Sequence, residues 1–265
     1  MNVTHWIKRH LNLTIFLGAA LMIGGIYWLG MRRPISDLAT TWYWIMLVMV
    51  AFVLMLSYLV TGDLFFGWLI NEQNRMSLSR FQAFLWTLVI LSAYVTAVFA
   101  NLRFGFTQEG LAIAIPRDLW LAMGISVTAL VGSGLILEEK KKKLPQQPEM
   151  MAMEPREGVL NVEEKPSLLN LITGEELANR DKIDLTRLQS LLFTFILVGV
   201  YMASLSAMFS ELVTVTPEVQ DIAQNFPITS FPELGSSAIA LLGISQAGYL
   251  VAKAVDKQPS QSLTS

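Results

Sequence analysis

The chain has 265 residues, of which 53% are hydrophobic and only 15% are charged, whereas soluble globular chains carry about 25% charged residues. A formal net charge of -2 gives no basis for a nucleic-acid-binding surface, and the absence of cysteine excludes disulfides and thiolate chemistry. The two histidines, His5 and His10, have no neighbouring carboxylate, so we predict no metal site and no cofactor. The composition indicates a membrane protein.

Six apolar segments are long enough to cross a bilayer. A hydrocarbon core about 30 Å thick needs roughly 20 apolar residues of helix. The predicted spans lack Asp, Glu, Lys and Arg and cover residues 11–31, 42–61, 81–100, 119–137, 188–210 and 234–252. Aromatic residues such as Trp42 and Trp120 lie at their ends, as is typical of the membrane interface. The predicted fold class is all-α, a polytopic six-helix transmembrane bundle.

The first predicted domain, residues 1–62, is a transmembrane hairpin. Lys8 and Arg9 precede its first span, as they would in a signal peptide. The apolar run of about 20 residues is long for that role, and no A-x-A cleavage pattern follows it. We therefore expect an uncleaved anchor.

The next two hairpins of spans share a polar pattern that predicts an internal duplication. The segment SRFQAFLWT at 79–87 aligns with TRLQSLLFT at 186–194, and a Gly-Ile-Ser triplet follows each, at 124–126 and 243–245. Apolar matches between membrane helices carry little information, but a shared Arg, Gln and Thr at fixed spacing carries more. We predict that 63–137 (repeat A) and 167–255 (repeat B) are parallel repeats, related by an axis along the membrane normal.

The repeated residues have two interpretations, as helix contacts or as the lining of an inner vestibule. A glutamine about one turn inside the membrane needs a partner, and glycine lets a neighbouring helix approach closely. We favour helix contacts, with N-caps at Ser79 and Thr186 or, two residues earlier, at Ser77 and Asp184. The candidate positions are Arg80, Gln82, Thr87, Gly124, Ser126, Arg187, Gln189, Thr194, Gly243 and Ser245.

The stretch between the two repeats, residues 138–166, is predicted to be a basic and then flexible cytoplasmic linker. It begins with a basic run suited to anionic lipid headgroups, formed by Lys140, Lys141, Lys142 and Lys143. After it, residues 167–178 are amphipathic, with Glu175 and Glu176 on the polar side, and are expected to lie along the inner membrane surface. Residues 256–265 are predicted to be a disordered tail.

The basic residues predict the orientation. With the N-terminus inside, 15 of the 19 Lys and Arg residues fall in cytoplasmic segments, which indicates that both termini are cytoplasmic. The compact loops, the lack of cysteine and this charge bias are compatible with a bacterial inner membrane.

No span carries an ionisable residue near its middle, which argues against an ion-coupled carrier, and no catalytic motif indicates an enzyme. Two functional hypotheses remain. The first is a non-enzymatic scaffold or subunit of a membrane complex that binds a membrane-protein partner. The second is a homo-oligomeric passive pore with Arg80, Gln82, Arg187 and Gln189 at its inner mouth.

Overall fold

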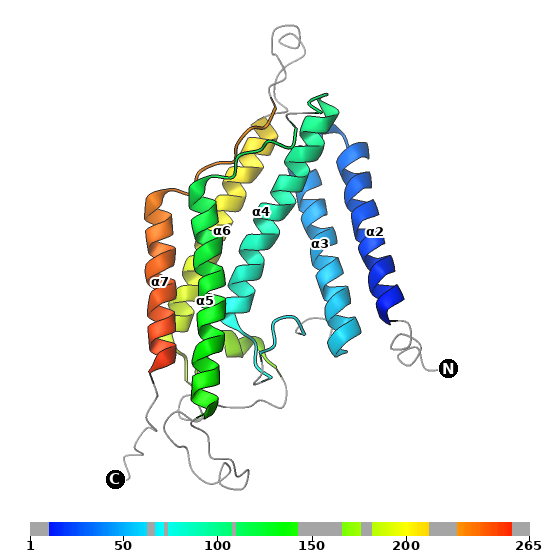
Figure 1. Cartoon of the computed structure of the whole chain (residues 1–265). Coiled ribbons are helices and arrows are strands. Elements are labelled where there is room, and N and C mark those ends of the chain that lie inside the picture. The colour runs from blue at the N-terminus through cyan, green and yellow to red at the C-terminus, as the bar shows by residue number, and fades with distance from the viewer. Residues whose placement is uncertain are drawn as a thin grey trace, which may run out of the picture. The chain divides into compact units, whose positions relative to one another are not determined.

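A computed structural model describes residues 11–62, 67–71, 74–107, 110–142, 166–175, 182–211 and 227–255, and for residues 141 and 142 it describes the backbone alone. The regular elements within these ranges are helices (Figure 1), which confirms the all-α class. Six of them are long and apolar enough to cross a membrane: α2 (Leu11–Arg32), α3 (Leu38–Thr61), α4 (Leu78–Arg103), α5 (Arg117–Lys142), α6 (Leu185–Glu211) and α7 (Ser236–Ala254). The chain is therefore a multi-pass membrane protein with the six spans that the sequence predicts.

The helix ends differ from the predicted spans for local reasons. α4 and α6 begin before the apolar run because polar residues just before them, Ser77 and Asp184, cap the first turn. α3 is preceded by a 3-10 turn, η1 (Ile35–Asp37). It ends at Thr61 and is followed by Gly62, whose φ of 78° places it in the left-handed region that glycine adopts without strain. α7 begins at Ser236 rather than at residue 234, since Gly235, with a φ of 86°, does not have a helical backbone conformation.

The chain divides into two compact units, each described here by itself. The first comprises Met1–Trp68, Leu85–Trp120 and Val198–Leu234, and the second comprises Leu69–Phe84, Leu121–Leu197 and Gly235–Ser265.

The core of the first unit is aromatic and uncharged. Trp42 is fully buried and donates its indole N–H to the Ser92 hydroxyl over 2.8 Å, while its ring packs against Phe209 with centroids 5.7 Å apart. Trp86 packs similarly against Tyr201, with centroids 6.2 Å apart. Apolar contact supplies the stability here, and the polar groups at this core are neutral.

The loops of the first unit are tied to its helices by hydrogen bonds. The buried Asn101 side chain donates to the carbonyl of Ile228 over 3.0 Å and accepts from the amide of the same residue over 2.7 Å. Nearby, Ala114 and Ser230 form an isolated parallel β-bridge. Buried backbone groups outside helices are thereby satisfied.

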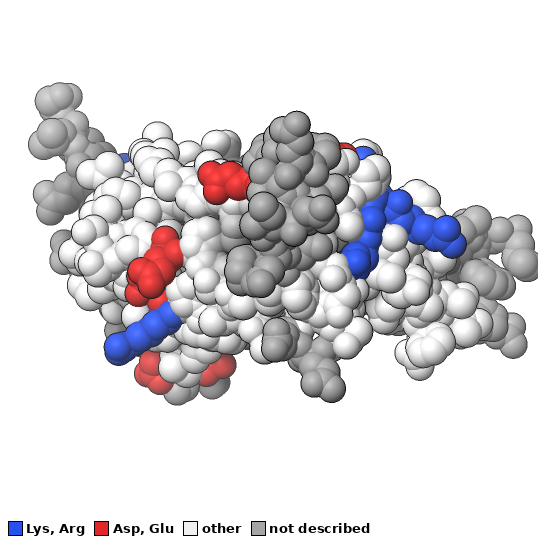
Figure 2. Space-filling view, turned by 90° about the horizontal axis from the view of Figure 1, so that it is seen from above, with Lys and Arg blue, Asp and Glu red and all other residues white. Residues whose placement is uncertain are grey.

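The outward-facing sides of the helices are apolar, as a lipid environment requires. In the most apolar window of α3 only 11% of the residues are buried within the protein, and Leu47 and Val60 are more than half exposed. In the view of Figure 2 most of the described surface is uncharged, and the charged side chains form a few separate groups.

Candidate functional site

Two short hairpins in the second unit lead directly into α4 and α6. The first is closed by an antiparallel β-bridge between Ile70 and Met76, and the second by a bridge between Thr173 and Ile183. The predicted amphipathic stretch at 167–178 is different in the structure: it contains a 3-10 turn, η3 (Leu168–Leu171), followed by the second hairpin, and its last three residues lie outside the described ranges.

Each hairpin ends in a residue that caps the following helix. The Ser77 hydroxyl accepts from the amide of Arg80 over 3.4 Å at the start of α4. At the start of α6 the Asp184 carboxylate accepts from the amides of Thr186, over 3.0 Å, and of Arg187, over 3.4 Å. The caps are therefore Ser77 and Asp184, the earlier of the two predicted pairs, because each hairpin ends and the following helix begins at these residues.

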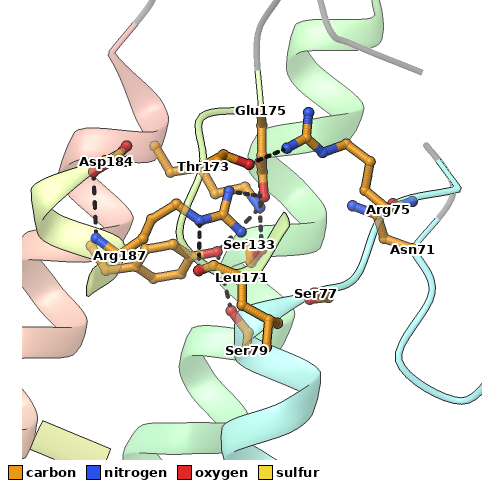
Figure 3. A network of polar contacts seen from close by, with 12 residues as sticks. Asn71, Arg75, Ser77, Ser79, Ser133, Leu171, Thr173, Glu175, Asp184 and Arg187 are labelled. Carbon is orange, nitrogen blue, oxygen red and sulfur yellow. Dashed lines mark hydrogen bonds and ion pairs between the residues drawn. The ribbon is translucent and has the colours of Figure 1, made fainter. Parts of the chain in front are cut away.

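Glu175, two residues after the bridge residue Thr173 of the second hairpin, is the centre of a buried ionic cluster (Figure 3). Its Oε1 atom lies 2.9 Å from the Arg187 guanidinium. The Lys253 ammonium lies 2.8 Å from Oε2 and 2.9 Å from Oε1. The hairpin, the start of α6 and the end of α7 therefore meet at one carboxylate, and we call these three residues the Glu175 cluster.

The cluster keeps Glu175 ionised. Burial alone would raise the pKa of this carboxyl group, but the positive charges of Lys253 and Arg187 outweigh burial and lower the pKa to about 2. A buried ion pair is stable only when further hydrogen bonds satisfy its members. The sequence prediction that placed Glu175 on a solvent-facing polar side is wrong, because two basic residues from α6 and α7 enclose it.

The surroundings of the cluster comprise neutral side chains and the buried Arg75, whose positive charge also lowers the pKa of Glu175. Lys253 also donates to the hydroxyls of Ser133, on α5, and of Tyr249, one turn earlier on α7. The Tyr249 ring lies 5.8 Å from the Arg187 guanidinium and 5.7 Å from the Lys253 ammonium, within cation–π range. The Tyr249 hydroxyl receives a hydrogen bond of 3.4 Å from Ser79 on α4.

A neutral polar contact lies one turn further along α4. Gln82 is fully buried, and its amide nitrogen donates to the hydroxyls of Ser190, over 2.9 Å, and Thr194, over 2.8 Å, on α6. Gln189, which occupies the matching place in the aligned sequence, is exposed. The two glutamines thus have different roles: only Gln82 joins two helices in the part of the chain that the structure describes.

The remaining predicted positions also divide between buried and exposed. Arg80 is half-buried and donates to the carbonyl of Ile70. Ser126 is buried and donates to the carbonyl of Ala122 in its own helix, and Gly243 faces Ile125 of α5. Ser245 is buried, whereas Thr87 and Gly124 are exposed.

The side chain of Gln246, next to Ser245 on α7, is 2% exposed, and neither its amide oxygen nor its amide nitrogen has a hydrogen-bond partner among the described residues.

Of the predicted lipid-contacting lysines, Lys140 is described, and it is buried and donates to the carbonyl of Val255 over 3.3 Å. The side chains of Lys141 and Lys142, and Lys143 as a whole, lie outside the described part of the chain.

Sequence reasoning missed the central members of the cluster. Lys253 contributed only to the count of basic residues, although it lies on the same side of α7 as Tyr249 and Ser245, all three being buried. The sequence signal for a buried Lys253 was its spacing, because it continues the face of α7 that Ser245 and Tyr249 occupy.

Within the described ranges no group of three or more His, Cys, Asp or Glu residues could hold a metal ion. Comparisons with protein-family models, with curated proteins and with solved structures found no match.

Proposed function

We propose that this integral membrane protein is a non-enzymatic scaffold or subunit of a membrane complex. The observation that carries the proposal is the Glu175 cluster: its carboxylate is engaged by Arg187 and Lys253 from two helices, rather than directed at a passage or a substrate. Such a cluster fixes the ends of helices, which is the property a docking platform needs.

The distribution of charge along the spans supports the same proposal. In the described helices, Asp, Glu, Lys and Arg occur only within the first or last five residues. A carrier that moves a charged substrate or couples to ions needs ionisable groups deeper in the bundle. Catalysis would likewise need groups positioned for chemistry, so we propose that the protein is not an enzyme.

We further propose that the hairpin pairs α4–α5 and α6–α7 are parallel repeats. Three described features support a duplication: a bridged hairpin before α4 and before α6, a capping residue at the same place in each, and a tyrosine 14 residues after Arg80 and Arg187. Those tyrosines, Tyr94 and Tyr201, both donate to backbone carbonyls of the loop that follows their helix.

The alternative is a homo-oligomeric passive pore. Exposed Gln189 and half-buried Arg80 are the two predicted mouth residues that can face a passage between copies, whereas Gln82 and Arg187 are engaged inside one chain. A pore lined by all four residues is therefore the less favoured proposal.

For localisation we propose a bacterial cytoplasmic membrane with both termini inside, because the basic residues concentrate in the predicted inner segments. Fusing a reporter that is active on only one side of the membrane after residue 265 tests this. Activity of a periplasmic reporter at that position would contradict it.

Extraction of the tagged full-length protein from its native membrane in mild detergent, followed by mass determination of the intact complex, tests the main proposal. A stoichiometric complex with a different membrane protein is expected. A symmetric homo-oligomer that conducts solutes in liposomes, with conductance changed by Arg80→Ala together with Gln189→Ala, would contradict it and favour the pore.

A further inference from the structure

A small pocket with a mixed polar and apolar lining lies in the second unit between the start of α4 and the last turns of α5. Its volume is about 80 Å³, which is several times the roughly 10 to 15 Å³ that one water molecule needs on the same measure. Besides two leucines of α5, the residues that line it are Asn71, Ser77, Arg80, Ser133, Gly134 and Glu138. A pocket of this volume accommodates a small chemical group and not a large ligand.

The pocket lies at the level of lipid headgroups. Arg80 is in the first turn of α4. Glu138 is two residues before Lys140, where the membrane-spanning part of α5 ends. Gly134 and Glu138 are exposed, so the pocket is open to the surroundings of the protein on this side. A ligand that reaches it from the bilayer does not have to cross the helix bundle.

The lining carries one charge of each sign. The Arg80 guanidinium can bind a phosphate oxygen, and the exposed Glu138 carboxylate can accept from an ammonium group. A simple anion would be repelled by Glu138, and a simple cation by Arg80. The pair fits a ligand that itself carries both charges a few bonds apart.

The two serine hydroxyls add hydrogen-bond donors. Ser133 accepts from the Lys253 ammonium, and Ser77 accepts from the amide of Arg80, so each hydroxyl retains its own hydrogen for an acceptor in the pocket. A phosphate oxygen is such an acceptor. Because Lys253 belongs to the Glu175 cluster, the pocket also borders the positive charge of that cluster.

We propose that this pocket binds the headgroup of a phospholipid that carries both a phosphate and a primary ammonium group, with Arg80 on the phosphate and Glu138 on the ammonium. The exposed side of α5 next to the pocket is apolar: Val131 and Leu135 are 57% and 58% exposed and can lie along an acyl chain. The inference does not depend on the scaffold proposal.

The test is lipid retention by the full-length protein, measured by native mass spectrometry after delipidation and addition of an equal mixture of phosphatidylethanolamine, phosphatidylcholine and phosphatidylglycerol with the same acyl chains. Phosphatidylethanolamine is expected to be retained in preference, because phosphatidylcholine has no N–H donor and phosphatidylglycerol has no amine. Equal retention of the three lipids, or preference for phosphatidylglycerol, would overturn the proposal.

Variants connect the retained lipid to this pocket. Arg80→Gln is expected to lower phosphatidylethanolamine retention about tenfold, since charge-assisted hydrogen bonds to the phosphate are lost. Glu138→Gln is expected to remove the preference over phosphatidylglycerol. Arg117→Gln, at the other end of α5, and Glu139→Gln, which does not line the pocket, are the matched controls and should retain the lipid as the wild type does.

Gly134→Leu tests the pocket without removing a charge. Gly134 lines the pocket, and a Cβ atom there would meet no heavy atom within 4 Å, so a side chain can be added at the opening without its first atom displacing a neighbour. Loss of retention in this variant is expected, and unchanged retention would place the lipid elsewhere and overturn the proposal. Displacement of the lipid by millimolar inorganic phosphate would show that the site takes free phosphate, which also overturns it.

Discussion

The starts of α4 and α6 carry an arginine and a glutamine at the same spacing, but each helix buries a different member of the pair more fully. At α4 the arginine, Arg80, is half-buried, and the glutamine, Gln82, is fully buried against α6. At α6 the arginine, Arg187, is buried in the Glu175 cluster, and the glutamine, Gln189, is exposed. Sequence similarity between two segments therefore does not fix which of their polar residues faces the protein interior.

The difference follows from what each helix meets. The second hairpin supplies a carboxylate, Glu175, within 2.9 Å of Arg187, so a buried guanidinium is compensated there. Arg80 instead donates to a backbone carbonyl and remains partly exposed, which keeps its charge near polar surroundings. A buried amide needs only neutral partners, and Ser190 and Thr194 supply them to Gln82.

The largest expected effect in this comparison comes from Glu175→Gln. The substitution leaves Arg187 and Lys253 buried without their shared carboxylate, and we expect a loss of about 3 to 5 kcal/mol in the free energy of unfolding in detergent. Asp37→Asn, which breaks the partly exposed Arg33–Asp37 pair, is the matched control and should cost no more than about 1 kcal/mol. Equal costs for the two variants would mean that the Glu175 cluster does not stabilise the fold.

Acid should remove the same contribution in the wild type. Because the pKa of Glu175 is lowered from its ordinary value of 4.5 to about 2, the native state binds fewer protons than the unfolded state between these values. Stability from this group is present above pH 4.5 and is lost as the pH falls toward 2. Unfolding measured across that range should show a smaller acid loss in Glu175→Gln than in the wild type, and identical pH profiles would contradict the assignment.

The two glutamines give a smaller, paired test. Gln82→Leu removes hydrogen bonds between α4 and α6, and we expect a cost of about 1 to 2 kcal/mol. Gln189→Leu changes an exposed side chain and should stay within about 0.5 kcal/mol of the wild type. If the costs were reversed, the assignment of the buried and exposed members of the repeat would be wrong.

The smallest effect is expected at Gln246. Both polar atoms of its buried amide lack a hydrogen-bond partner among the described residues, so Gln246→Leu removes a desolvation cost and breaks no described hydrogen bond. The unfolding free energy should be unchanged or increased. A clear loss of stability would indicate that the amide is satisfied by a group such as a buried water.

The sequence alone predicts the six spans because a bilayer imposes a length of apolar residues that can be counted directly. It also places Arg187 and Gln82 among the candidate residues, since polar residues at the end of an apolar run are conspicuous. The Glu175 cluster could not be predicted, because Glu175 and Lys253 are 78 residues apart and meet only through tertiary packing. Their separate positions, in a loop and at a helix end, are those of ordinary exposed charges.

The most direct test of the Glu175 cluster is the effect of Lys253→Met in two backgrounds, measured as the free energy of unfolding. In the wild type the substitution removes a partner of Glu175 and should destabilise the protein; in Glu175→Gln it removes an uncompensated buried cation and should stabilise it. A change of sign between the two backgrounds is the result that the cluster predicts. The same cost in both backgrounds, within about 0.5 kcal/mol, would contradict it.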